Sequence, residues 1–337
     1  MPAALARGLH ATMSKRSWAD RALDSDVGRL TRLFFAHPEA RAATSGTGVS
    51  TWWLAQIKRI LNLQGERRYE AVATIAAQTN WLFHVAAPWV REQLTPFWNS
   101  SHDGEDVAAF WSGFLAQNAV PQPPLFREMR SSLLRLAHTA FALRHEEARR
   151  LSNILLCAWG ERLDSNDDVP ENHVAATELR EVLIHAGEDY ADLTLWHLKQ
   201  LTLMAASTLT GESVCQFLRD VWPRQKTVRS ERFSESLVEL AVSLPGQFDD
   251  IVSEIVPKLT VLSQQSMVLH QANIVDEIVA NSPKLLVALM CVILDDDATK
   301  WPYHATDIVQ RLAASEAAQN EPQFETLLKT ASRRQVR

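Results

Sequence analysis

The chain has 337 residues, of which 46% are apolar and 22% charged, with a formal net charge of −6. This length and apolar content allow two domains of average size or one elongated domain with a full core. The mild negative charge argues against a protein that coats nucleic acid along its whole surface, although a local basic patch is compatible with it. Only 11 glycines are present, which favours helices over tightly turned hairpins.

The cysteines and the apolar runs bear on the cellular compartment. Cys157, Cys215 and Cys291 lie far apart and no CxxC pair occurs, so we expect buried, reduced thiols. The longest nearly pure apolar run, Leu285 to Leu294, is too short to cross a bilayer. The start of the chain carries positive charge but lacks the apolar core of a secretory signal. We therefore expect a cytoplasmic protein without membrane contact.

The first half of the chain predicts helices separated by polar and proline-rich links. Leu30 to Phe35 suggests a short helix, and residues 42–51 are interpreted as a loop. Asp106 is the expected cap of the helix that carries Phe110, and a later helix around Leu151 is expected to end near Gly160. Apolar residues recur at helical spacing in three further stretches: Thr51–Leu63, Arg68–Ala87 and Leu125–Leu143.

The second half is more regular. Trp222-Pro223 ends one helix, and Trp301-Pro302 repeats this stop. Ser282-Pro283 has the N-cap serine and first-turn proline of a helix start, and it opens the buried helix Leu285–Leu294. Two last helices follow, around Leu312 and Leu328. The remaining predicted helices are Val174–Ala186, Tyr190–Leu209, Glu212–Val221, Ser230–Leu244 and Asp249–Leu262.

Helices of about 10–20 residues with short polar links and no strand pattern predict an all-α fold of stacked antiparallel helical pairs. Pairs that recur at about 35–45 residues resemble a HEAT-like α-solenoid, and an irregular helical array is the alternative. We interpret residues 1–90 as an N-terminal helical segment that continues from an upstream domain. Residues 91–337 form a helical-repeat-like region, in which the acidic loop 164–172 is the candidate internal boundary.

The sequence shows no recognisable catalytic motif. No Gly-Lys pair occurs, so a P-loop is absent. His145-Glu146-Glu147 lacks the second histidine of a helical zinc site, and Asp295-Asp296-Asp297 fits a solvated turn better than a calcium loop. His185, Glu188 and Asp189 are compatible with an acid–base group, but a helix cap is the favoured interpretation. We expect no catalytic residue, cofactor or metal.

Two groups of residues are candidates for a partner surface. One is the densest aromatic group of the chain, and any exposed aromatic patch is expected there. The other is a local basic segment that an acidic partner or a phosphate could contact, although a solvated loop is the favoured interpretation. The aromatic group consists of Phe97, Trp98, Phe110 and Trp111, and the basic segment contains Arg219, Arg224, Lys226, Arg229 and Arg232.

Several of these segments resemble one known family. Pro96-Phe97-Trp98, followed by Trp111-Ser112-Gly113-Phe114-Leu115, is similar to a signature of the C-terminal helical region found behind SIR2-like domains in bacterial anti-phage proteins. Trp196 and Val221-Trp222-Pro223 fit the later part of that region. The resemblance also includes Ser230–Leu240, Phe248–Leu259, Pro283–Ile293 and Leu312–Leu328, and it covers about residues 90–330.

The resemblance carries over no catalytic residue, because the NAD-hydrolysing chemistry of that family belongs to a separate SIR2 domain. It implies a sensor, regulatory or assembly module of an anti-phage defence system, with the effector outside this chain. The hypothesis is therefore a non-catalytic helical interaction module whose partner is a protein, either the effector domain or a phage protein, and oligomers are compatible with it. The alternatives are a nucleic-acid-binding helical array, which is less favoured, and a stand-alone helical enzyme.

Overall fold

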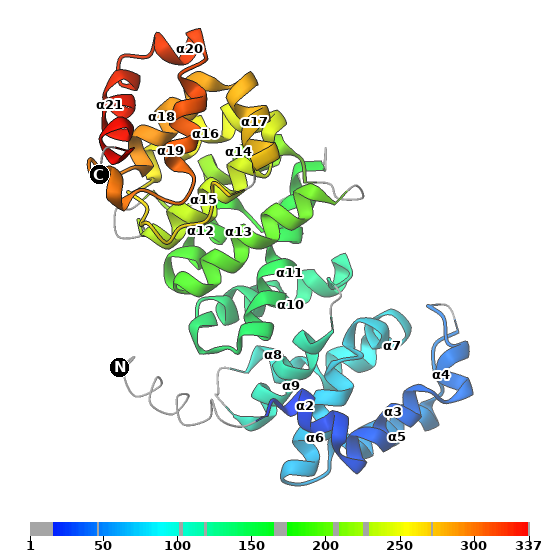
Figure 1. Cartoon of the computed structure of the whole chain (residues 1–337). Helices are drawn as coiled ribbons and strands as arrows, with labels where there is room; N and C mark the ends of the chain where they lie inside the picture. Colours follow the sequence, from blue (N-terminus) through cyan, green and yellow to red (C-terminus); the bar gives the residue numbers. More distant parts are fainter. Residues whose placement is uncertain are drawn as a thin grey trace. The chain divides into compact units, whose positions relative to one another are not determined.

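The structure is a computed structural model, and it describes residues 16–45, 47–100, 104–117, 120–164, 174–204, 209–224, 229–270 and 272–335. These residues form 20 α-helices and no β-strand, which confirms the predicted all-α helical array (Figure 1). The described chain divides into two compact units. The first contains the residues up to Ala158 together with Val174, and the second contains residues 159–164 and 175–335.

The first unit is built around one central helix, α6 (Glu66–Ala76), whose residues 71–76 are all buried. This helix packs against α2, α3, α5 and α9. Its buried face includes Ala71, Ala73 and Ala76, and such short side chains let neighbouring helices approach closely. The other helices of this unit are α2 (Trp18–Asp24), α3 (Asp26–Phe35), α4 (Pro38–Ala42), α5 (Thr51–Leu61), α7 (Thr79–Gln93), α8 (Thr95–Asn99), α9 (Glu105–Ala116), α10 (Pro123–Ala137) and the first part of α11 (His145–Asp164).

In the second unit the short helix α16 (Phe248–Ile255) lies in the core. Its apolar stripe of Phe248, Ile251, Val252 and Ile255 is buried at helical spacing. It contacts α14, α15 and α18. The other α-helices of this unit are α12 (Ala176–His185), α13 (Glu188–Leu203), α14 (Gly211–Gln216), α15 (Glu231–Val242), α17 (Ala272–Asn281), α18 (Pro283–Ile293), α19 (Ala305–Leu312), α20 (Glu316–Gln319) and α21 (Phe324–Gln335).

The predicted helix stops in this unit are present. After α14 the chain makes a π-helical turn over Phe217–Val221, and Trp222 then adopts an extended backbone ahead of Pro223. The Trp222 ring is buried against Phe217 and Phe233. Trp301 is likewise extended and fully buried, and its indole Nε1 donates a 2.5 Å hydrogen bond to the carbonyl of Asp295. Each Trp-Pro stop therefore also supplies a large core side chain.

Several predicted boundaries were wrong. The expected helix 68–87 is two helices that meet near Ala77, and α7 has a kink at Ala86, two residues before Pro88. Helix α11 continues past Gly160, where Leu209 packs so closely that a Cβ would lie 2.7 Å from its Cδ2. Asp106 lies within the first turn of α9 and forms an ion pair with Arg68 at 2.7 Å, whereas Gly104 is the N-cap.

Two other helices are shorter than predicted, and one helix was not predicted. The helix after Tyr190 ends at Leu203, well before Leu209. The helix expected over 249–262 ends at Ile255, because Pro257 converts the next turn to a 3-10 helix. Helix α17 was not predicted, since its sequence ANIVDEIVAN contains no proline or glycine stop that sets it apart. The acidic loop 164–172 lies outside the described residues beyond Asp164.

The contact between α6 and α9 gives a stability prediction. A Cβ added at Gly113 would overlap the backbone carbonyl of Ala73, so Gly113→Ala must push the two helices apart. We expect a loss of about 1–3 kcal/mol in unfolding free energy, as for other overpacked cores, measured by denaturant unfolding of the full chain. Gly246→Ala is the matched control, because a Cβ there meets nothing within 4 Å. Equal stability of the two variants would contradict the prediction.

Candidate functional site

The aromatic group lies in the core of the first unit. Phe110 is fully buried, with Phe97 and Phe114 stacked at ring-centroid distances of 6.0 and 5.9 Å. Trp111 contacts Phe110 edge-on at 5.4 Å, and Trp98 lies 5.5 Å from it. The expectation that Phe97, Trp98, Phe110 and Trp111 form an exposed surface is therefore wrong. These four rings pack α8 against α9, so none of them is available to a partner protein.

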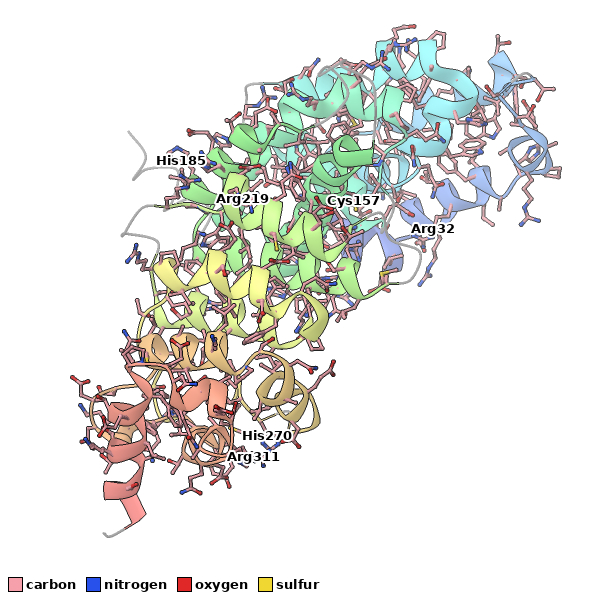
Figure 2. The ribbon with its side chains drawn as sticks, turned by 90° about the horizontal axis from the view of Figure 1, so that it is seen from above. Arg32, Cys157, His185, Arg219, His270 and Arg311 are labelled. Carbon is pink, nitrogen blue, oxygen red and sulfur yellow. The ribbon has the colours of Figure 1, made fainter. Side chains whose placement is uncertain are left out.

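The basic segment is exposed, but much of its charge is already engaged. Arg219, which is labelled in Figure 2, forms an ion pair with Glu254 at 2.8 Å, and hydrogen bonding to that carboxylate raises the pKa of Arg219. Arg232 contacts Asp189 at 2.6 Å and Asp192 at 2.9 Å. Arg224 donates to the carbonyl of Arg219 at 3.0 Å.

Arg224 and Arg229 are also exposed, and Lys226 lies outside the described residues. The ion pairs of Arg219 and Arg232 weaken the case for a phosphate-binding surface, because each pair would have to break before its arginine could contact a phosphate.

The three residues considered for acid–base chemistry are exposed at helix ends. His185 lies 3.5 Å from Glu181 on its own helix, with 55% of its side chain exposed. Asp189 is 82% exposed and is held by Arg232, and Glu188 is exposed in the first turn of α13. This arrangement stabilises helix ends. It fits the interpretation as a helix cap that the sequence favoured for these three groups.

A pair of histidines forms another polar cluster in the second unit. His270 Nδ1 and His304 Nε2 lie 3.0 Å apart, and Asp307 lies 3.4 Å from the other ring nitrogen of His304. His304 has a left-handed backbone with φ of 65°. Across the described parts of the chain, no group of three or more His, Cys, Asp or Glu side chains is arranged to hold a metal ion.

Three leucines near the start of the first unit are exposed to solvent. Leu23, Leu30 and Leu33 are 60%, 59% and 65% exposed. Leu30 and Leu33 are three residues apart on α3, so they lie on one side of this helix. The opposite side packs through Gly28 and Thr31. We call Leu23, Leu30 and Leu33 the leucine surface. The sequence predicted a short helix that contains Leu30 and Leu33, but it did not predict that these two leucines face solvent.

A polar cleft lies next to this surface in the same unit. Its volume is about 540 Å³, and residues of α2, α3, α6, α9 and α11 line it. Small residues, among them Ala73, Ala77, Gly113 and Ala116, form apolar parts of its wall. The charged residues of the lining are Asp20, Arg32, Arg144, Glu146, Glu147 and Arg150, with His145 beside them.

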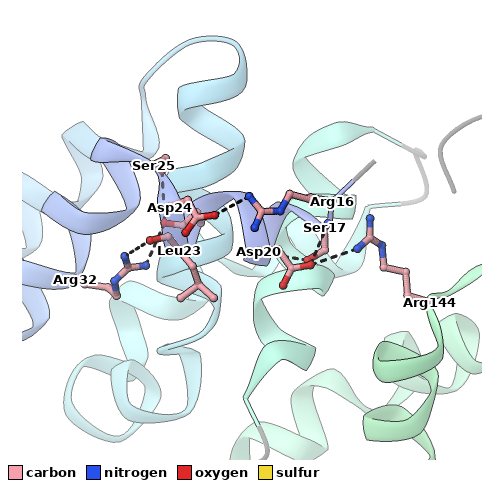
Figure 3. Close-up of polar contacts among 9 residues, drawn as sticks. Arg16, Ser17, Asp20, Leu23, Asp24, Ser25, Arg32 and Arg144 are labelled. Carbon is pink, nitrogen blue, oxygen red and sulfur yellow. Dashed lines mark hydrogen bonds and ion pairs between the residues drawn. The ribbon is translucent and has the colours of Figure 1, made fainter. Parts of the chain in front are cut away.

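Hydrogen bonds connect three helices along the wall of the cleft. The Ala19 amide of α2 donates to Ser112 Oγ of α9 at 3.1 Å, and the Ser112 side chain is hydrogen-bonded to Glu147 of α11. The Arg144 amide donates to the Glu147 carboxylate at 3.3 Å, and the Arg144 guanidinium contacts Asp20 at 3.4 Å (Figure 3). These bonds place the start of α11 against α2 and α9.

Two further arginines line the cleft. Arg32 donates to the carbonyls of Ala22 and Leu23 at 3.1 and 2.8 Å, at the C-terminal end of α2 (Figure 3). Arg150 donates from Nη1 to the carbonyl of Leu115 at 2.6 Å. Its Nε–H is buried and has no acceptor among the described residues. Arg32 is thus committed to the backbone, whereas the guanidinium of Arg150 is only partly satisfied.

The chain gave no match when compared with protein-family models, with curated proteins or with solved structures. Among the described helices, none has the length and apolar character required to cross a bilayer. The candidate sites therefore rest on the geometry of this chain alone.

Glu147 gives a prediction on pH dependence. Burial raises its pKa despite the Arg144 amide and Ser112, so the folded chain binds the proton more tightly than the unfolded chain. The stabilising effect of the neutral carboxyl is complete below the pKa of the unfolded chain, about 4.3. It is lost as the pH rises through the higher pKa that Glu147 has in the folded chain. Glu147→Gln keeps a neutral group, so its stability relative to the original chain should increase over that pH range.

The measurement is urea unfolding of both chains at intervals from about pH 4 to pH 7. Glu146→Gln is the control, since it removes the preceding carboxylate, whose side chain is 62% exposed. A difference between Glu147→Gln and the original chain that stays constant with pH would refute the burial argument.

Proposed function

We propose that the chain is a non-catalytic helical interaction module that binds an effector protein in bacterial anti-phage defence. The resemblance to the helical region behind SIR2-like domains supports the defence role and an effector outside this chain. The all-α array supports a binding scaffold, in which the helical pairs act as HEAT-like repeats. We further propose that the module acts in the cytoplasm as a sensor or regulator of that effector.

The leucine surface is the observation that carries the proposal. Its three leucines are each at least 59% exposed, and burial of a leucine side chain contributes about 1.5–3 kcal/mol. Scattered exposed leucines are ordinary, but Leu30 and Leu33 share one face of α3, and such a pair suits an apolar protein surface. Nucleic acid fits this surface poorly, because leucines make no contacts to phosphates.

Charges around the leucines point to the kind of partner surface. Asp24 and Asp26 are exposed beside them, and Arg29 lies 3.8 Å from Asp26. A partner helix with an apolar stripe and charges of both signs along its edges would match this pattern. We propose that such a helix belongs to the effector, because that is the partner implied by the resemblance.

The test is co-purification of the tagged full chain with the effector encoded beside it, followed by a titration of the purified pair. Leu30→Glu combined with Leu33→Glu should weaken binding at least about 10-fold, because two charges would be buried against an apolar helix. Met267→Glu in the second unit is the matched control, as Met267 is 53% exposed. It should bind like the original chain.

Two results would count against the proposal. If the double variant binds the effector as tightly as the original chain, the leucine surface is not the interface. If only a phage protein is retained, and only from infected cells, the module is a sensor of that protein and the effector assignment is wrong. Circular dichroism of the double variant establishes that any loss of binding is not a loss of fold.

A further inference from the structure

We propose that the polar cleft of the first unit binds a small organic anion, whose carboxylate or phosphate oxygens are recognised by Arg144 and Arg150. This inference is independent of the leucine surface, since it rests on other side chains and concerns a small molecule. The cleft is confined to the first unit and is formed by segments far apart in sequence, near residues 20, 75, 115 and 147.

The size and the walls of the cleft suit a small molecule. Its volume of about 540 Å³ lies within the usual range of ligand pockets, about 300–1,000 Å³. Ala73, Ala77, Gly113 and Ala116 leave a smooth apolar wall, because none has a side chain longer than a methyl group. Such a wall favours a flat ring, while the charged side chains of the lining come from α2, α3 and the start of α11.

Arg150 supplies the reason for an anion. Its buried Nε–H lacks an acceptor, and an unsatisfied buried donor costs about 1–3 kcal/mol. Its Nη1 donates to the Leu115 carbonyl, which anchors one corner of the guanidinium. With a small shift of the side chain, an oxyanion could accept from the Nε and Nη2 edge, the two-bond geometry in which arginine binds carboxylate and phosphate.

Arg144 is positioned to be a second cation for the ligand. Its contact with Asp20 is long, at 3.4 Å, and 39% of its side chain is exposed. An ion pair of this kind contributes little, so exchange of Asp20 for a ligand oxygen costs little. The Arg144 amide, in contrast, is engaged by Glu147, which keeps the residue at the edge of the cleft.

The acidic residues of the lining are partly neutralised. Glu146 pairs with Arg149 at 3.0 Å, and Asp20 also accepts the Ser17 amide in the capping box of α2. Burial raises the pKa of Glu147, which favours the neutral form of its carboxyl group. Arg32 is committed to carbonyls, whereas Arg144 has only a long contact with Asp20 and Arg150 has an unsatisfied donor. The balance therefore favours an anion over a cation.

The experiment is calorimetric titration of the full chain with four probes. 5′-AMP has a flat ring and a phosphate, benzoate has a flat ring and a carboxylate, adenosine has the ring alone, and inorganic phosphate has the anion alone. We expect AMP or benzoate to bind more tightly than about 1 mM, and adenosine and phosphate to bind at least about 10-fold more weakly. If AMP binds more tightly than benzoate, the ligand carries a phosphate, and if benzoate binds more tightly, the ligand carries a carboxylate.

Variants connect the binding to the two arginines. Arg144→Gln and Arg150→Lys should each weaken the better probe by about 10- to 100-fold, the usual cost of a charge-assisted hydrogen bond. Arg91→Gln is the matched control, because Arg91 pairs with Glu128 on α10 and does not line the cleft. Ala77→Leu keeps both guanidiniums but fills the cleft, so it should also abolish binding. It provides the test if Arg150→Lys proves unstable.

The proposal is overturned if neither AMP nor benzoate binds, or if adenosine binds as tightly as AMP. Unchanged affinity in Arg144→Gln and Ala77→Leu would also overturn it, as would tighter binding of benzamidine, a flat cation that would select Glu147 and Asp20 instead. Weaker binding in the arginine variants and in Ala77→Leu, with Arg91→Gln unchanged, supports it.

Discussion

The close contact between α6 and α9 is the constraint on which the first unit depends. Gly113 lies against the carbonyl of Ala73, with no space for even a methyl group. Every residue of α6 from Ala71 to Ala76 is buried, so this helix has no solvated side over its last turn and a half. Through its other contacts, α9 stacks its aromatic residues on α8, so this helix joins α6 to α8.

The same contact explains why a cleft remains beside it. Small side chains bring two helices together, but they cannot fill the space where a third helix diverges. Between α2, α9 and the start of α11 that space is lined by alanines and by polar groups. Ser112 accepts from α2 and bonds to Glu147 on α11, so the wall is held by hydrogen bonds where apolar packing is absent. A buried carboxyl in that position opposes folding when it is charged, which is consistent with a site shaped for more than stability.

Local sequence patterns predicted much of the fold and little of the candidate sites. Helical periodicity, the Ser282-Pro283 helix start and the Trp-Pro stops are short-range signals, and the structure contains them. The pairing of Arg232 with Asp189 and Asp192 joins residues about 40 positions apart, and no local pattern shows it. The same limit explains the aromatic group, because a high density of rings does not say which of them face outward.

The exposed leucines were missed for a related reason. A helix with apolar residues on two sides reads as a core helix until its neighbours are known. In α3 the small residues Gly28 and Thr31 face the unit while the larger Leu30 and Leu33 face solvent, the reverse of the usual arrangement. Hydrophobicity alone would place the two leucines in the core, and the glycine and threonine nearer the surface.

The leucine surface and the cleft meet at the C-terminal end of α2. Leu23 lines the cleft and is also 60% exposed. Arg32 of α3 holds the carbonyls of Ala22 and Leu23, so the last turn of α2 and the helix bearing Leu30 are tied together by hydrogen bonds. A shift of the last turn of α2 would therefore alter the leucine surface and the cleft together. Two sites that share one structural element are coupled only if that element has more than one arrangement, and here the element is the turn between α2 and α3.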